Sequence, residues 1–183
     1  MIKQINLITG NDGKAAEFAA MLGIEVTAVK RELPEIQSLD VREVAARKAA
    51  DALQLLGEPV LVDDTGLAVE EWNGLPGALI AWFIDSVGPL GILNMAQGLT
   101  SRRATVTTAL GYAAPGRPVQ VFQGTLNGSL ATSPRGTSGF GYDPIFIPEG
   151  ETRTYAEMTP EEKNATSHRR LAVEQMKRSL GLV

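Results

Sequence analysis

The 183-residue sequence predicts an α/β fold in which helices flank a mixed sheet. Three observations predict it. Short apolar runs alternate with amphipathic helical patterns in the first third of the chain, an alternating pattern in the middle folds back on itself, and the last quarter carries two helix-start signals. No segment of linker-like composition separates two halves, so we expect a single domain over residues 1–183.

The first half of the chain alternates apolar, turn-forming and helical patterns. A glycine follows each helical pattern and can adopt the left-handed conformation that closes a helix. The second helix also has a start signal, because Asp40 and Glu43 are spaced as in a capping box. These patterns predict strands at residues 2–8, 24–29 and 60–62, turns at residues 9–13, 63–66 and 73–77, and helices at residues 14–22 and 41–56.

The second half begins with a helix and a hairpin. Pro89 suits the first position of a helix that runs to residue 96. Alternating residues at 106–112 and 119–125, separated by turn residues at 114–117, predict two antiparallel strands.

Two helices are predicted near the C-terminal end. Thr159 and Glu162 form a capping box with Pro160 at the first helical position, and Ser167 is expected to cap the last helix. We expect the inner face of that helix to carry Leu171, Ala172, Gln175, Met176 and Leu180.

The composition excludes much of the usual catalytic chemistry. The chain has no cysteine and one histidine, His168, so it has neither a thiolate nucleophile nor the ligands of a cysteine- or histidine-rich zinc site. Any metal is expected to have oxygen ligands. The first residues lack a secretory leader pattern, the longest apolar run is too short for a membrane span, and the net charge of −4 argues against broad nucleic-acid binding. We expect a cytoplasmic protein that binds neither nucleic acid nor a membrane.

The turn after the first strand is a candidate anion-binding site. Its glycines let a ligand approach the backbone, the amides at the start of the next helix point outward, and a lysine adds positive charge. An ordinary strand-to-helix turn explains the same pattern, and the spacing differs from that of a Walker A loop. The residues concerned are Thr9, Gly10, Asn11, Asp12, Gly13 and Lys14.

Two acids that directly follow the apolar run at 60–62 are candidate metal ligands. Side chains of adjacent strand residues point to opposite faces, so one of Asp63 and Asp64 can face a cleft while the other braces the turn. A carboxylate at the end of a strand suits magnesium, and Glu35 is a candidate second ligand. The alternative is a turn in which the aspartates cap backbone amides and Glu35 is solvated.

A glycine-rich aromatic segment is a candidate base-binding surface. Phe140 and Tyr142 can stack on a planar base, and Asp143 can form hydrogen bonds to it. A loop that packs both rings into the core fits the same residues.

The start of the last helix is unusually basic. His168 and Arg169 stand where a cation opposes the helix dipole, which favours an anion or an acceptor-rich ligand nearby. A solvated charged face is the alternative, and a serine hydrolase is weaker because no G-x-S-x-G elbow is present.

Together and in this order, the clusters resemble the inosine triphosphate pyrophosphatase family. The shared motifs are T-G-N-x-x-K at residues 9–14, L-P-E at 33–35, D-D-T-G-L at 63–67, N-G-L-P-G at 73–77, G-F-G-Y-D-P-I-F at 139–146, A-E-M at 156–158 and E-K-N-A-x-S-H-R at 162–169.

The resemblance implies an elongated mixed sheet with flanking helices and two lobes around a central substrate groove. It also implies a homodimer that hydrolyses non-canonical purine nucleoside triphosphates to the monophosphate and pyrophosphate with magnesium. Glu35 and Asp64 would bind magnesium, and Asp64 would activate the attacking water. The implied substrate-binding residues are Thr9, Gly10, Asn11, Asp12, Gly13, Lys14, Lys48, Thr65, Phe140, Gly141, Tyr142, Asp143, Lys163, His168 and Arg169.

Two other functions remain open from the sequence. One is a Maf-like nucleotide pyrophosphatase with another base preference, and the other is a single-strand RNA-binding module built on Phe140 and Tyr142. The apolar segment at residues 79–84 is a candidate dimer interface, although burial in the core explains it equally well.

Overall fold

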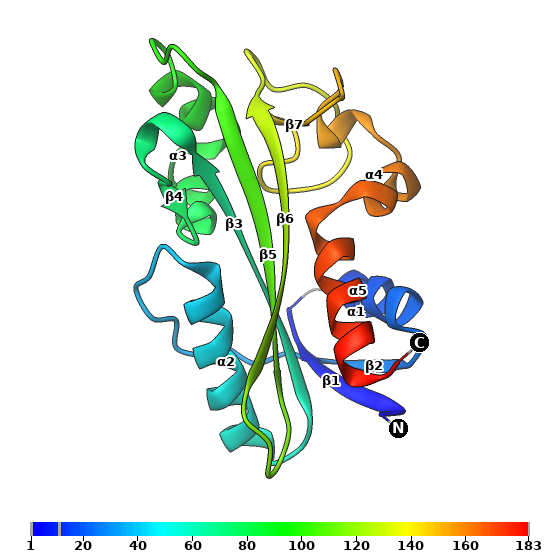
Figure 1. The fold of residues 1–183 in the computed structure, drawn as a ribbon. Helices are drawn as coiled ribbons and strands as arrows, with labels where there is room; N and C mark the ends of the chain where they lie inside the picture. Colours follow the sequence, from blue (N-terminus) through cyan, green and yellow to red (C-terminus); the bar gives the residue numbers. More distant parts are fainter. Residues whose placement is uncertain (1, 11, 183) are drawn as a thin grey trace.

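The computed structural model describes residues 2–10 and 12–182 of the chain. A seven-stranded mixed sheet runs through this part of the protein in the order β2-β1-β3-β5-β6-β7, and β4 pairs with β3 beside that path (Figure 1). The strands are β1 (Gln4–Ile8), β2 (Glu25–Val29), β3 (Val60–Val69), β4 (Pro76–Gly77), β5 (Arg103–Ala113), β6 (Gln120–Leu130) and β7 (Phe146–Pro148).

Helices cover both faces of this sheet. The last helix packs mainly on β6, and the second packs on β5 and β3. The helices are α1 (Asp12–Leu22), α2 (Val41–Leu56), α3 (Ile80–Met95), α4 (Pro160–Thr166) and α5 (His168–Leu180), with 3-10 turns at Glu70–Trp72 and Tyr155–Glu157. None of the helices in the part of the chain that the structure describes is long and apolar enough to cross a membrane.

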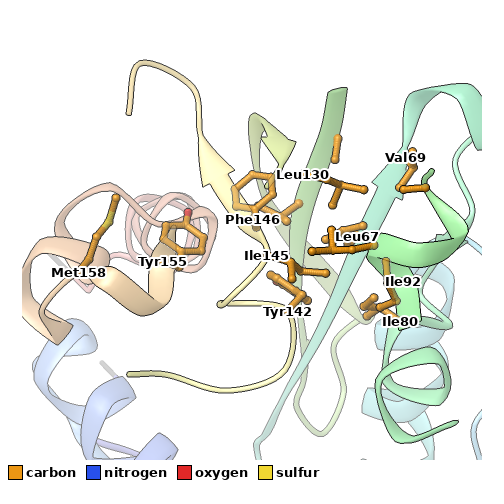
Figure 2. Packing of buried hydrophobic residues seen from close by; sticks show 14 residues of the cluster. Leu67, Val69, Ile80, Ile92, Leu130, Tyr142, Ile145, Phe146, Tyr155 and Met158 are labelled. Atoms are coloured by element: carbon orange, nitrogen blue, oxygen red, sulfur yellow. The ribbon is translucent and has the colours of Figure 1, made fainter. Parts of the chain in front are cut away.

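Three long strands, β3, β5 and β6, form the spine of an elongated molecule (Figure 1). β3 pairs with β5 along its whole length, from Val60 opposite Ala113 to Val69 opposite Ala104. At one end of this spine α1 and α5 cover one face and α2 covers the other. At the other end, α3 and the segment 142–158 enclose a separate core cluster around Leu67 and Phe146 (Figure 2). The fold is therefore the elongated, two-lobed α/β arrangement expected from the resemblance.

Most elements and caps that local sequence patterns predict are present in the structure. Thr159 and Glu162 make a reciprocal capping box at the start of α4, and the Ser167 side chain accepts from Arg170 N at the start of α5. Gly57 ends α2 in the left-handed conformation. The hairpin is present and is longer than predicted, because β5 and β6 pair from Tyr112 opposite Gln120 to Arg103 opposite Ser129.

The predicted turn at residues 63–66 is wrong. β3 continues through these residues to Val69, because β5 provides a paired neighbour at every position. Asp63 and Asp64 therefore lie within a long strand, and their side chains point to opposite faces as expected.

Smaller differences concern helix ends and faces. α3 begins at Ile80, well before Pro89, and Gly88 at φ +69° separates its two helical halves. The Asp40 side chain caps α2, but the predicted capping box with Glu43 does not form directly. Glu43 instead accepts a hydrogen bond from the Ser38 hydroxyl, and the Ser38 oxygen accepts from Asp40 N. Leu171, which was predicted on the inner face of α5, is exposed, and Val173 is buried there instead.

Candidate active site

The site is built around an open stretch of the β3 edge. β1 pairs in parallel with Val60 and Leu61, and β4 pairs with Leu67 and Ala68. Between these two neighbours, no strand within residues 2–10 and 12–182 pairs with that edge. Side chains from both faces of β3 can therefore lie beside this open stretch of edge, which explains how two oppositely directed aspartates belong to the same site.

Asp63 points to the face covered by α1 and α5. Its side chain is only 2% exposed, and Asp63 Oδ2 accepts from Lys14 Nζ at 2.9 Å and from Arg169 Nη2 at 3.3 Å. Arg169 is itself buried and lies 3.6 Å from Glu17 Oε1. Burial alone would raise the pKa of Asp63, but Arg169 and Lys14 outweigh it and lower the pKa to about 2. Asp63 is thus a permanent anion that ties α1 to α5.

Asp64 points to the face covered by α2. Its Oδ1 accepts from Lys48 Nζ at 2.6 Å, and the same ammonium lies 2.6 Å from Glu35 Oε2. Burial raises the pKa of Asp64 to about 6, against the opposing effect of Lys48. Asp64 Oδ2 is buried and has no hydrogen-bond partner among the described residues.

The donor set around Asp64 fits a hard divalent cation. Two carboxylates converge there, and a buried carboxylate oxygen of Asp64 is still available. The described residues contain no group of three or more histidine, cysteine, aspartate or glutamate side chains arranged for a metal. Magnesium commonly takes only one or two protein carboxylates and completes its shell with water and phosphate oxygens, so Glu35 and Asp64 are sufficient.

A small cavity of about 130 Å³ lies on the Asp63 side of the edge. Both lobes contribute to its lining, because α3 and the 140–143 loop meet the starts of α4 and α5 there. The lining residues are Thr65, Ile80, Ala81, Ile84, Phe140, Gly141, Tyr142, Asp143, Lys163, His168 and Arg169.

The two aromatic residues of the 140–143 loop have different environments. The Phe140 side chain is 53% exposed, whereas Tyr142 is buried and its hydroxyl lies 3.0 Å from His168 Nε2. The Tyr155 ring also stacks on the His168 ring, with centroids 6.1 Å apart. Burial, together with the neighbouring Arg169, lowers the pKa of His168 to about 3. His168 is therefore neutral at physiological pH and acts through hydrogen bonds.

Asp143 organises the loop that carries Phe140. Its Oδ2 accepts from Phe140 N at 2.8 Å and from Lys163 Nζ at 2.6 Å. Gly139 must be glycine, because its φ is +75° and an added Cβ would lie 2.1 Å from Asp143 Oδ2. Lys163 Nζ is 5.0 Å and Lys14 Nζ 5.9 Å from the centre of the Phe140 ring, within the range of cation–π contacts.

The structure brings most of the predicted site residues together around this edge. Thr9 and Gly10 follow β1, and Asp12 and Gly13 begin α1, while Asn11 lies outside the described residues. The sequence left open which of Asp63 and Asp64 faces the cleft, the resemblance gave Asp63 no role, and nothing in the sequence analysis singled out Glu17. Lys14 and Glu17 are three residues apart, which places them on one face of a helix, and this spacing was the available signal for Glu17. The sequence does not show that Lys14 contacts the distant Asp63, or that Glu17 contacts the distant Arg169.

A larger cavity of about 580 Å³ lies elsewhere, on the α2 side of the sheet near β7. Its Arg103 and Glu70 already pair with each other at 2.7 Å and are largely exposed to solvent. The small cavity is the stronger candidate, because two of its lining residues carry buried polar atoms that have no hydrogen-bond partner among the residues described, His168 Nδ1 and Arg169 Nε.

The RNA-binding interpretation lacks its structural basis. It needs two aromatic rings displayed on a strand, but residues 141–145 form turns and Tyr142 belongs to the core. Of these two residues, Phe140 is the one with an exposed ring, and Figure 2 shows Tyr142 packed beside Ile145.

The fold and the site define an α/β protein with a cluster of paired charged side chains at an open edge within a mixed sheet. The chain matches the Ham1 family over residues 5–179 and belongs to that family. A protein of Methanopyrus kandleri named dITP/XTP pyrophosphatase is 47% identical over 170 residues, which cover 91% of this chain and 90% of that protein. A Schizosaccharomyces pombe protein named inosine triphosphate pyrophosphatase is 42% identical over 175 residues, covering 94% and 92%. The solved Ham1 protein of Staphylococcus aureus has a TM-score of 0.88 at 30% identity, with 98% of each chain covered.

Proposed function

We propose that this protein hydrolyses non-canonical purine nucleoside triphosphates, such as inosine, deoxyinosine and xanthosine triphosphate, to the monophosphate and pyrophosphate. The arrangement along the β3 edge carries this proposal. Lys14 and Lys48 lie beside Asp63 and Asp64, and the cavity with Phe140 adjoins them. This edge of β3 thus offers cations for a triphosphate next to a partly aromatic cavity for a base. The names of the relatives support the same substrate class.

The proposed phosphate contacts come from both faces of the sheet. Lys14 lies on the first turn of α1, where helix amides also favour anions, and Lys48 projects from the middle of α2. Phosphoryl chemistry mainly requires positioning and neutralisation of charge, which lysines and helix amides supply without cysteine or a histidine cluster.

We propose that Glu35 and Asp64 hold magnesium. When bound, the metal would neutralise phosphate charge and increase the acidity of a bound water. The support is the buried Asp64 Oδ2, which has no hydrogen-bond partner among the described residues, together with the convergence of Glu35 and Asp64 on the Lys48 ammonium.

Asp64 is the proposed general base for the attacking water. Its carboxylate lies beside Lys48, where the phosphates are proposed to bind, and would accept the proton of this water. The water oxygen bonds to phosphorus, its proton passes to Asp64, and the bond between the α and β phosphates breaks to leave pyrophosphate. Lys48, which contacts Asp64, is positioned to stabilise the negative charge that remains on the phosphates.

The preference for hypoxanthine and xanthine is proposed to come from unpaired donors in the cavity. These bases present a 6-keto acceptor where adenine presents an amino donor. Arg169 Nε is a buried donor without a partner among the described residues, and Asp63 and Glu17 hold the rest of its guanidinium in place. A site with such donors can reject a base that leaves them unpaired by a factor of about 10⁴.

The protein is also proposed to act as a cytoplasmic homodimer. Residues 79–84 divide between core and surface, because Ile80 is buried while Trp82 is 67% exposed. Val87, Leu90 and Met95 add exposed apolar side chains to the same helix. An exposed apolar helix surface of this kind is typical of a subunit interface.

A nucleotide panel tests the proposed activity. Each of the purine and pyrimidine triphosphates is incubated with the protein and magnesium, and pyrophosphate release is measured. We expect release from inosine and xanthosine triphosphates and little from adenosine triphosphate. Preference for a pyrimidine or a standard purine triphosphate would favour a Maf-like enzyme, and no release from any nucleotide would exclude both enzymes.

A further inference from the structure

We propose that Lys48 occupies the cation position between Glu35 and Asp64 in the free protein and leaves it when a nucleotide binds. Divalent metal would then bind weakly to the free protein and tightly to the nucleotide complex. This inference rests on the proposed function, which assigns these two carboxylates to magnesium, and it adds a role for Lys48 beyond contact with phosphate.

The geometry around Lys48 carries the inference. Its ammonium is 2.6 Å from a carboxylate oxygen of Glu35 and 2.6 Å from one of Asp64. These two acids come from different segments, the loop before α2 and the middle of β3, and the ammonium is the group that joins them. Lys48 thus stands between the same pair of oxygens that would bind a metal.

The helix that carries Lys48 is held in a fixed position. Ala45 and Ala49, which flank Lys48 in the sequence, are fully buried and pack α2 onto the sheet. The approach is so close that a Cβ at Gly111 would lie 2.4 Å from Ala45 O. The helix therefore has no room to move inward, and movement of the ammonium must come from the flexible lysine stem.

Two cations cannot share these carboxylates without repulsion. A divalent ion between Glu35 and Asp64 would lie close to the Lys48 ammonium, and like charges at such distances repel strongly in a partly buried site. A triphosphate offers the ammonium other oxygens within reach of its stem, and so frees the carboxylates. Because coupling between two ligands is reciprocal, metal and nucleotide should each increase the affinity of the other.

Lys14 provides a matched control. It is also a lysine paired with an aspartate, Asp63, at 2.9 Å, and it also faces the proposed phosphate site. It lies on the opposite face of β3, however, and does not stand between the two proposed metal ligands.

The test measures binding of magnesium to nucleotide-free protein by titration calorimetry, with the magnesium-dependent rise in Tm as a second readout. The variants are Lys48→Met, Lys48→Gln and the control Lys14→Met. We expect the dissociation constant for magnesium to fall at least about tenfold in both Lys48 variants, which corresponds to about 1.4 kcal/mol, and to stay at the wild-type value in the control. Adding α,β-methylene inosine triphosphate, which resists cleavage, should tighten magnesium binding in the wild type far more than in the Lys48 variants.

The outcomes separate this inference from the proposed function. Equal magnesium affinity in wild type and both Lys48 variants, or weaker affinity in the variants, would overturn the role of Lys48 while leaving the metal site intact. A fall in the dissociation constant in Lys14→Met as large as in the Lys48 variants would also overturn it, because the effect would then be one of net charge. If magnesium binds to none of these proteins even with the nucleotide analogue, the proposed metal site fails as well.

Discussion

The two adjacent aspartates of β3 should have opposite effects on stability when each is replaced by asparagine. Asp63 is buried against Lys14 and Arg169, and its pKa of about 2 lies below the ordinary 3.8. Asp64 is also largely buried, but its pKa of about 6 lies above 3.8. Folding therefore favours the charged form of Asp63 and disfavours the charged form of Asp64.

The magnitudes follow from the pKa differences. A shift of one pKa unit corresponds to about 1.36 kcal/mol, so ionised Asp63 contributes about 2.5 kcal/mol to the free energy of unfolding at pH 7. Ionised Asp64 lowers the free energy of unfolding by up to about 3 kcal/mol at the same pH. Asp64→Asn should recover only part of this free energy, because Lys48 then keeps only Glu35 as a partner. We expect Asp63→Asn to destabilise by ~2–3 kcal/mol and Asp64→Asn to stabilise by ~1–2 kcal/mol.

The assay is urea unfolding of the metal-free protein at several pH values. The contribution of Asp63 is complete above pH 3.8 and is lost as the pH falls toward 2, so Asp63→Asn should differ from wild type over the whole range near neutrality. The cost of Asp64 is complete above about pH 6 and disappears toward pH 3.8, so the gain in Asp64→Asn should shrink over that interval. Equal destabilisation by the two substitutions at pH 7 would contradict the opposite pKa shifts of Asp63 and Asp64.

Three further predictions concern packing, acid stability and assembly. Gly124→Ala would place a Cβ 1.9 Å from His168 O, so α5 must move by about 1.5 Å to reach an ordinary 3.4 Å contact. We expect urea unfolding to show a free energy of unfolding ~1–3 kcal/mol lower than in the wild type, and kcat/KM for inosine triphosphate to fall. The control Thr125→Ala, at an exposed position, should change neither value. The pKa of His168 is lowered from 6.5 to about 3, so the unfolded chain binds a proton below pH 6.5 that the folded protein does not. Between pH 7 and 5, the free energy of unfolding should therefore fall by ~2 kcal/mol more in the wild type than in His168→Gln. Equal falls in the two proteins would contradict this. Trp82→Glu should convert the proposed dimer to a monomer in sedimentation, and a wild-type monomer would remove α3 as an interface.

The parts of the fold set by neighbouring residues were predictable from the sequence. The capping box at Thr159 and the cap at Ser167 depend on side chains two or three positions away, and both form as predicted. The left-handed glycines that end helices depend on one residue each, and Gly57 and Gly181 behave as expected.

The parts set by distant residues were not predictable in the same way. β3 extends past Asp63 and Asp64 because β5, about 40 residues later, pairs with it, and no local pattern contains that partner. Arg169 is buried because Asp63, 106 residues earlier, neutralises it. The motifs indicated which residues belong to the site, but the bridge from Lys48 to Glu35 and Asp64 required the packing of α2 on the sheet.

Asp64 is the residue proposed to perform the chemistry, in a site whose other residues bind the nucleotide. The most direct measurement compares Asp64→Asn with wild type for formation of inosine monophosphate and pyrophosphate from inosine triphosphate with magnesium, alongside binding of α,β-methylene inosine triphosphate. We expect the variant to be folded and at least as stable as wild type without metal. It should still bind the analogue and turn over at least about 10²-fold more slowly. Turnover at the wild-type rate in this variant would contradict this role of Asp64.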